Sequence, residues 1–452
     1  MRNLTLGLGL IIPPIPKILL PMPNGITSRW AIPFNIYEQG RTYTTDFNFD
    51  GIMPIGTAVY VTKTGNDTTG NGTSGNPYRT LAKADAVGAT IIYIGAGIWD
   101  RTDGFAANYN PTRHISLISK DGPGKAILTR AVVGNTLSWV QQSSPNNNVY
   151  LATRSSVGSI IDLTAPRRAG NYMKDGVNLV PIALSKQTSI ANCQANPGSW
   201  YLTGSSLYVC TFDGRPPDAN ILVNLVENIL APTNNVNIWV DGIEGWGDSF
   251  ARHIPATVNS NFWAWRNSAS RFCQSTANLL NISNVDVCYS FGCEVSDQLN
   301  TYDGFNYHNS LSTTTKFIEV NCTAYRCGAN DGGKNDNGST AHDNVVGVRL
   351  NGDYESTWGP SVADTLGART VNLGVTAGNS NLTGTGDAQR SAFQVGVVSA
   401  TDGLNSMMWN RNCTSVGGGY AMYAATGGTI YDWGGNIDNT AQHNGGSIIA
   451  YP

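Results

Sequence analysis

Residues 57–100 decide the fold, and they read TAVYVTKTGNDTTGNGTSGNPYRTLAKADAVGATIIYIGAGIWD. Alternating apolar residues predict a strand over 58–62, and a polar region rich in Gly and Asn follows it. Pro77 then opens a short amphipathic helix. A second strand is expected over 90–94, ending at Gly95. This order predicts a cap followed by the first turn of a repeating structure.

The composition favours β-structure. The chain has 452 residues, of which 51 are Gly, and only 13% are charged, against about 25% in ordinary domains. This disfavours helical bundles and coiled coils. Hydrophobic residues make up 41%, with 19 Tyr, 11 Trp and 12 Phe, which is too apolar and aromatic for a disordered chain. We therefore expect a folded, all-β protein.

Beyond residue 230 the sequence repeats loosely. Short apolar-alternating stretches are separated by turns rich in Asn, Gly, Asp or Ser, as in 278–296 and 316–333. Asn recurs at or just before the expected bends, at Asn281, Asn284, Asn321 and Asn412. The ragged period of roughly 20 to 30 residues is typical of solenoid coils. Stacked at ~4.8 Å, about 14 coils would form a rod ~65 Å long.

The N-terminal part lies outside this repeat. Residues 1–56 have no helical period and frequent Pro and Gly, which predicts an extended arm that needs a surface to pack on. The alternative for the opening apolar run is a secretory signal peptide. Pro13, Pro14 and Pro16 interrupt that run, so a retained arm is favoured.

A second departure interrupts the body, which spans 101–452. A hairpin is expected with strands over 200–203 and 206–210, joined by a Gly-Ser turn. We therefore predict a lateral β insertion over about 170–232.

Charge, hydropathy and cysteine content limit which partners and ligands are expected. The net charge is −3 with no basic run, so nucleic acid is a poor candidate partner. No apolar stretch is long enough to span a membrane. Eight Cys without a CxxC pair are too few for a disulfide framework. The pairs Cys288/Cys293 and Cys322/Cys327 are expected to be inward-stacked core thiols and not disulfides or metal ligands. No cofactor and no metal are predicted.

The cap resembles that of right-handed parallel β-helix proteins, the pectate-lyase-like superfamily that includes bacteriophage tailspikes. The matching residues are Asn76-Pro77-Tyr78-Arg79-Thr80-Leu81, Gly88, Ile91, Tyr93, Ile94, Gly95, Gly97 and Trp99. The resemblance implies a right-handed parallel β-helix and a homotrimeric spike that binds or cleaves a bacterial surface polysaccharide. It also implies a virion location, with residues 1–56 attached to other tail proteins; a secreted protein is the alternative. It carries over no catalytic residue.

The candidate catalytic and substrate-binding residues are concentrated between residues 294 and 355, where two of the five His lie among many carboxylates. Coil-length separations would place carboxylates on neighbouring rungs, as glycoside hydrolysis requires. Asp331 is the preferred acid, Asp343 or Asp303 the preferred base, and His342 is added to the catalytic set. The predicted substrate-binding residues are His308, Tyr302, Tyr307, Glu319, Arg349, Asp353, Tyr354 and Trp358.

Other interpretations remain open. Each Asp here also suits an ordinary turn, where it caps backbone N–H groups. Trp263 and Trp265 share one face, which is either core or a sugar-stacking platform. The function is a polysaccharide hydrolase, a non-catalytic binding or structural spike, or a secreted lyase. Hydrolysis is preferred over elimination because the window has few cationic side chains.

Overall fold

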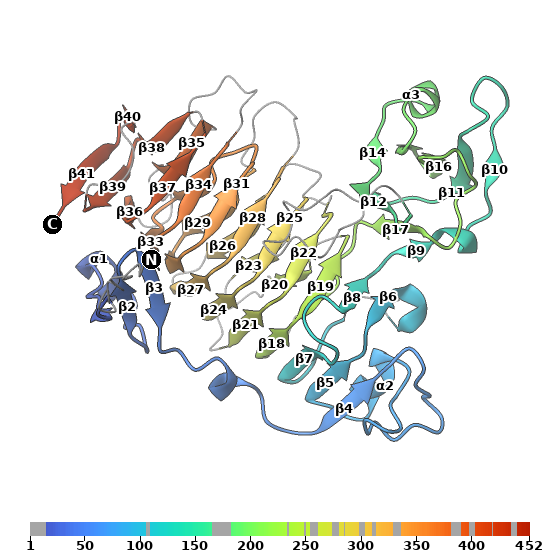
Figure 1. Ribbon diagram of the computed structural model, residues 1–452, viewed down its shortest axis with the longest axis horizontal. Helices are drawn as coiled ribbons and strands as arrows, with labels where there is room; N and C mark the ends of the chain where they lie inside the picture. Colours follow the sequence, from blue (N-terminus) through green and yellow to red (C-terminus); the bar gives the residue numbers. More distant parts are fainter. Residues whose placement is uncertain are drawn as a thin grey trace, which may run out of the picture.

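Three parallel sheets run along one axis in the computed structural model, and each is built from strands of successive coils (Figure 1). The structure describes residues 15–104, 109–164, 182–232, 235–247, 250–253, 261–273, 280–283, 285–297, 303–309, 313–328, 336–380, 390–396, 403–417, 419–434 and 441–452. From β18 to β38 each turn of the chain contributes one strand to each sheet. The predicted all-β solenoid is confirmed, and the fold is a parallel β-helix.

The strands of each sheet pair in register with the next coil. Sheet 1 contains β4 (Ala58–Val61), β5 (Ile91–Ile94), β7 (Ile115–Ser119), β18 (Ile238–Asp241), β21 (Phe262–Arg266), β24 (Val287–Phe291), β27 (Thr315–Val320), β30 (Val345–Leu350), β33 (Arg369–Leu373), β36 (Ser406–Arg411), β39 (Gly428–Trp433) and β41 (Ser447–Tyr451). Sheet 2 has shorter strands: β6 (Gly97–Trp99), β8 (Ala126–Thr129), β19 (Ile243–Trp246), β22 (Ala269–Arg271), β25 (Glu294–Ser296), β28 (Thr323–Tyr325), β31 (Asp353–Glu355), β34 (Thr376–Gly378) and β37 (Thr414–Val416). Sheet 3 contains β20 (Ala251–His253), β23 (Leu280–Ser283), β26 (Phe305–Asn309), β29 (Ser339–Asp343), β32 (Val362–Thr365), β35 (Ser391–Gly396), β38 (Tyr420–Ala425) and β40 (Ala441–Asn444).

Asparagine makes the turn from sheet 1 to sheet 2. Asn321, Asn351 and Asn412 all have φ near 50°, in the left-handed region that Asn tolerates. Asn351 also donates to Asn321 Oδ1 at 3.0 Å, so stacked turns support each other. The prediction is confirmed at positions 321 and 412. Asn281 instead lies within β23, and position 284 is outside the described residues.

The cap has the predicted order of strand, helix and strand. Thr80 caps α2 (Leu81–Ala86) by accepting from the Lys83 N–H. Leu81 and Ala84 are buried against β4 and β5. A one-turn 3₁₀ helix, η2 (Arg101–Asp103), follows β6, and the Asp100 side chain caps its start.

Replacing Asp103 with asparagine is expected to destabilise the cap by about 2 kcal/mol. Asp103 is buried and pairs with Lys63 and Arg79, the latter at 2.6 Å. Burial would raise its pKa, but these cations and the Asp100 N–H outweigh burial and lower it. A lowered pKa gives stability that is present above about pH 4 and lost as the pH falls further. The free energies of unfolding of the wild type and the variant, measured by urea denaturation, should therefore converge in acid. A difference between them that does not change with pH would contradict this.

The lateral insertion begins earlier than predicted. It follows β8, and its described strands begin at Val132 and end at Leu225, whereas the prediction was about 170–232. Its first sheet contains β10 (Val140–Gln141), β11 (Tyr150–Thr153), β14 (Ser185–Lys186), β15 (Ser199–Thr203) and β16 (Ser206–Cys210), with α3 (Ile190–Ala195) beside it. A second sheet contains β9 (Val132–Val133), β12 (Val157–Asp162), β13 (Ile182–Ala183) and β17 (Ile221–Leu225), and η3 (Gly134–Thr136) follows β9. The predicted hairpin is present as β15 and β16. Because the insertion is larger, sheet 1 has twelve strands and spans only ~53 Å rather than the predicted ~65 Å.

The N-terminal strap, residues 15–56, packs along the outer face of sheet 1. It contains β1 (Ile18–Leu19), α1 (Asn24–Thr27), β2 (Ile36–Gln39), β3 (Thr42–Thr45) and the 3₁₀ helix η1 (Asp50–Ile52). Figure 1 shows its small antiparallel sheet beside the C-terminal coils, from which the chain returns to β4. The arm is therefore not free over these residues. Residues 1–14 lie outside the described part.

Aromatic stacking and ion pairs hold the strap in place. Phe47 stacks on Tyr289 with ring centroids 4.4 Å apart, and Phe49 lies 5.1 Å from Trp239. Toward the C-terminal end, Glu38 pairs with Arg411 at 3.0 Å. The strap thus buries a second apolar layer outside the solenoid core.

The solenoid interior contains the residues predicted for it. Cys288, Cys293, Cys322 and Cys327 are free and buried in the solenoid core, as predicted, whereas Cys193 and Cys210 are buried in the lateral insertion. Trp263 and Trp265 are also buried on the inner face of β21, so they are core and not a sugar-stacking platform. None of the described helices has the length and hydropathy that a membrane crossing requires.

Candidate functional site

Sheet 3 brings two histidines side by side. His308 on β26 and His342 on β29 are direct partners in the parallel register. Residues of a strand face alternately inward and outward, so Tyr307 and Ala341 enter the core while the two histidines point outward. Their rings stack with centroids 4.3 Å apart. Their side chains are 32% and 23% exposed.

Asp343 joins them through its backbone conformation. It ends β29 with φ 64°, a left-handed value that costs a non-glycine residue roughly 1 kcal/mol or more. In a regular strand its side chain would point away from that of His342. Here its Oδ2 lies 2.6 Å from His308 Nε2 and 3.0 Å from His342 Nδ1. We call His308, His342 and Asp343 the His–Asp cluster.

These contacts determine where the cluster holds its protons. Burial would raise the pKa of Asp343, but hydrogen bonds and charge from both imidazoles outweigh burial and lower it far below its ordinary value. An ionised carboxylate only accepts hydrogen bonds. His308 Nε2 and His342 Nδ1 therefore both carry hydrogens and donate to it. In a neutral His308 ring the lone pair is then on Nδ1.

A buried amide supports His342 from its other side. Asn306 Nδ2 donates to Asp303 Oδ2 at 2.8 Å and lies 3.3 Å from His342 Nε2, which accepts. Asp303 also accepts from the Asn337 N–H at 3.0 Å. Its residue is only 7% exposed, and burial raises its pKa. Asp303, predicted as a catalytic base, is therefore placed to orient Asn306 and not to contact a polymer.

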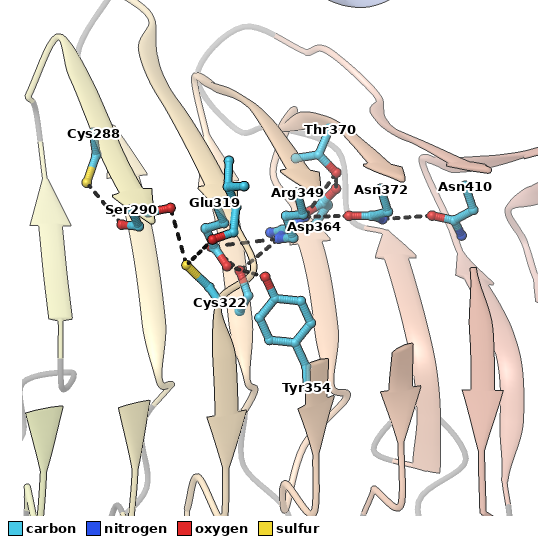
Figure 2. A network of polar contacts seen from close by, with 12 residues as sticks. Cys288, Ser290, Glu319, Cys322, Arg349, Tyr354, Asp364, Thr370, Asn372 and Asn410 are labelled. Carbon is cyan, nitrogen blue, oxygen red and sulfur yellow. Dashed lines mark hydrogen bonds and ion pairs between the residues drawn. The ribbon is translucent and has the colours of Figure 1, made fainter. Parts of the chain in front are cut away.

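Four predicted substrate-binding residues lie inside the solenoid. Tyr307, Glu319, Arg349 and Tyr354 are fully buried. Their strands direct them into the interior, where Figure 2 shows Glu319, Arg349 and Tyr354 in one polar network. This placement contradicts the prediction that they contact a polysaccharide, because a polymer cannot enter a close-packed core.

The interior network pairs one guanidinium with two carboxyl groups. Arg349 lies between Glu319, at 4.0 Å, and Asp364, at 3.3 Å. Ser339 Oγ links the first pair, because it donates to Glu319 at 2.8 Å and accepts from Arg349 Nε at 2.8 Å. Tyr354 donates to the other oxygen of Glu319. Burial raises the pKa of both carboxyls, and Arg349 opposes this. The role of these groups is structural.

The other predicted residues are scattered. Asp353 is half-buried on the outer face of β31 in sheet 2, where it accepts from Tyr325 at 3.1 Å. Trp358 is half-buried, and its backbone N–H donates to Cys327. Asp331 and Tyr302 lie outside the described residues, so their roles stay predictions.

Sequence reasoning missed two features. Asn306 stands two residues before His308 and so shares its outward face, a signal that alternation alone provides. Arg271, buried on the outer face of sheet 2, lies 3.4 Å from Glu244 and 3.2 Å from Glu294. These three charges come from three successive coils, and their spacing in the sequence gave no signal.

The His–Asp cluster also offers ligands for a metal ion. One atom from each of its three residues lies within 4.8 Å of the other two. Two imidazoles and a carboxylate suit Zn²⁺ and similar cations. No metal was expected from the sequence, because position along the chain does not reveal that the Asp343 side chain turns toward that of His342.

No protein-family model and no curated protein matches the chain. Among solved structures, one named glycoside hydrolase is 10% identical, with a TM-score of 0.46, covering 87% of this chain and 96% of that one. The complex of XylC with xylose is 12% identical, with a TM-score of 0.44, covering 87% and 68%. The tailspike protein gp49 from Pseudomonas phage LKA1 is 13% identical, with a TM-score of 0.27, covering 81% and 70%.

Similarity of this extent bears on neither substrate nor chemistry, since one fold serves many functions. The assignment of the chain as a parallel β-helix therefore rests on its own three sheets and their register.

Proposed function

We propose that this chain binds a bacterial surface polysaccharide on the outer face of sheet 3 and hydrolyses it at the His–Asp cluster. One observation carries the proposal: a carboxylate and two imidazoles, drawn from two coils, meet at a left-handed residue on a solvent-accessible face. Costly backbone conformations of this kind concentrate at functional sites.

The cluster suits activation of water. Hydrolysis of a glycosidic bond needs a base that takes a proton from water and an acid that protonates the leaving oxygen. Asp343 holds the Nε2–H of His308, which leaves Nδ1 of that ring to accept the proton. The carboxylate then stabilises the imidazolium that forms. Asp331 is the acid in this proposal, and Asp331→Asn should abolish cleavage.

The substrate would lie along the solenoid axis. Thr365 follows His342 in the register of sheet 3 and is also half-buried. A linear polymer on this face would meet polar side chains at His308, His342 and Thr365, in steps of ~4.8 Å, before the row reaches Gly396. An open row of this kind favours a long repeating chain over a small enclosed ligand.

The finer assignment is a tailspike-like protein of a phage tail. In this proposal the chain is a homotrimer that attaches to other virion proteins through its N-terminal residues. The strap already packs residues 15–56 on their own solenoid, so the attachment would involve residues 1–14 or the outer surface of the strap. Mass photometry of the purified protein tests the trimer.

Purified surface polysaccharide from the host should be depolymerised by the full-length protein. Cleavage should create new reducing ends without the ultraviolet absorbance of unsaturated sugars. Absorbance would indicate a lyase instead, and binding without new ends would indicate a non-catalytic spike. Size-exclusion chromatography of the digested polymer gives an independent measure of chain length.

A further inference from the structure

The donor set of the His–Asp cluster is that of a transition-metal site. Imidazole nitrogen and carboxylate oxygen are the ligands that Zn²⁺ takes, usually in tetrahedral coordination. Three protein ligands leave a fourth position open. All three side chains are partly exposed, so an ion has access from solvent.

We propose that His308 Nε2, His342 Nδ1 and Asp343 Oδ2 bind one Zn²⁺ or a similar borderline divalent cation. The inference goes beyond hydrolysis, because the site would bind the cation with no polysaccharide present. Its consequence for cleavage, argued below, rests on the proposed function.

The cluster needs only a small adjustment to admit the ion. Ligands about 2.1 Å from a tetrahedral centre lie about 3.4 Å from one another. Asp343 Oδ2 now lies 2.6 Å and 3.0 Å from the two nitrogens. Side-chain rotations that move Asp343 Oδ2 away from the two nitrogens by less than about 1 Å create the required oxygen–nitrogen spacing. The stacked rings, on adjacent strands in register, keep both nitrogens on the same side.

The cation and the proton taken from water both need the one nitrogen lone pair of the neutral His308 ring. A metal on His308 Nε2 leaves the single hydrogen of the neutral ring on Nδ1. Nδ1 then has no lone pair with which to accept a proton from water. Zn²⁺ occupancy and proton abstraction by His308 therefore exclude each other, so the cation acts as an inhibitor of cleavage.

Calorimetric titration of the chelator-treated, full-length protein with ZnCl₂ tests the site. We expect one Zn²⁺ per chain, since all eight thiols are buried and do not compete. His308→Ala and Asp343→Asn should each weaken binding at least tenfold. The control is His114→Ala, because His114 is exposed near β7 and accepts a hydrogen bond from the Asn237 N–H. It should bind as the wild type does. Circular dichroism checks that each variant folds.

Two results would overturn the metal site: no binding by the wild type, or undiminished binding by both cluster variants. Cleavage measured with saturating Zn²⁺ should be at least tenfold slower than with chelator. Unchanged or faster cleavage would overturn the exclusion argument. If Zn²⁺ binds but neither form cleaves any polysaccharide, the metal site stands and the proposed hydrolase fails.

Discussion

Arg349→Ala is expected to destabilise the solenoid by about 3–5 kcal/mol, because it leaves two carboxylates buried without their cation. Arg349 is fully buried and lies 3.3 Å from Asp364 and 4.0 Å from Glu319. It also stacks over Phe317, so its removal opens a cavity as well. Urea denaturation followed by circular dichroism measures the loss.

Two comparisons separate the charge effect from general disruption. Arg266→Ala removes a guanidinium from the outer face of sheet 1, where it is 29% exposed. Arg266 pairs with Asp241 and Asp50 and lies over the rings of Phe49 and Trp239, so its removal should cost about 1–2 kcal/mol. Lowering the pH should reduce the difference in free energy of unfolding between the wild type and Arg349→Ala. Burial raises the pKa of Glu319 and Asp364, and Arg349 opposes this, so its removal raises both pKa values further. The folded variant therefore takes up protons at a higher pH than the folded wild type does, and it gains more stability as the pH falls. If Arg349→Ala lowers the free energy of unfolding by less than about 1 kcal/mol, or by more in acid than at neutral pH, the network does not stabilise the solenoid by pairing Arg349 with the two carboxyls.

The cap and coils could be predicted because their signals are local. Thr80 and the glycines after β5 specify the start of a helix and the end of a strand through the conformations they allow. Pro77, which was predicted to open the helix, lies four residues before its first residue, Leu81. Asn at the bends does the same for the left-handed turns. The start of the insertion was missed because β9 and β10 have two residues each and carry no periodicity.

The interior network was misplaced for a different reason. Glu319 stands two residues after Phe317 and therefore shares its inward face. Ile318 and Val320, on the opposite face, are equally apolar and buried, since the strap covers them. With both faces of β27 apolar, alternation could not show which was the interior. Charged residues were then assigned to the surface, where they usually lie.

The site was predicted in part. His308, His342 and Asp343 were all named, and sheet 3 brings them together. What the sequence could not provide was the relative placement of loops whose lengths differ from coil to coil. Tyr307 and its register partner Ala341 are 34 residues apart in the sequence, whereas Ala341 and its next partner, Asp364, are 23 apart. Register across such unequal loops is settled only by packing.

Asp343→Asn is expected to lower kcat for polysaccharide cleavage by ~10²–10⁴ while leaving KM nearly unchanged. The amide cannot hold His308 in the same way, because it has no charge to stabilise an imidazolium. The fold should survive, since Asn already occupies left-handed positions at Asn321, Asn351 and Asn412. A merely structural role for Asp343 would move stability and KM instead of kcat.

Asp297→Asn is the matched control for that change. Asp297 also has a left-handed φ, of 56°, and its carboxylate is also paired, with Arg326 at 2.9 Å, but it lies at the end of β25 in sheet 2. The two substitutions thus remove the same charge from the same backbone conformation on different faces of the solenoid. If cleavage falls equally in both, the chemistry does not reside in the His–Asp cluster. If it falls only in Asp343→Asn, the loss follows from the contact with the imidazoles, since backbone strain and local charge are matched.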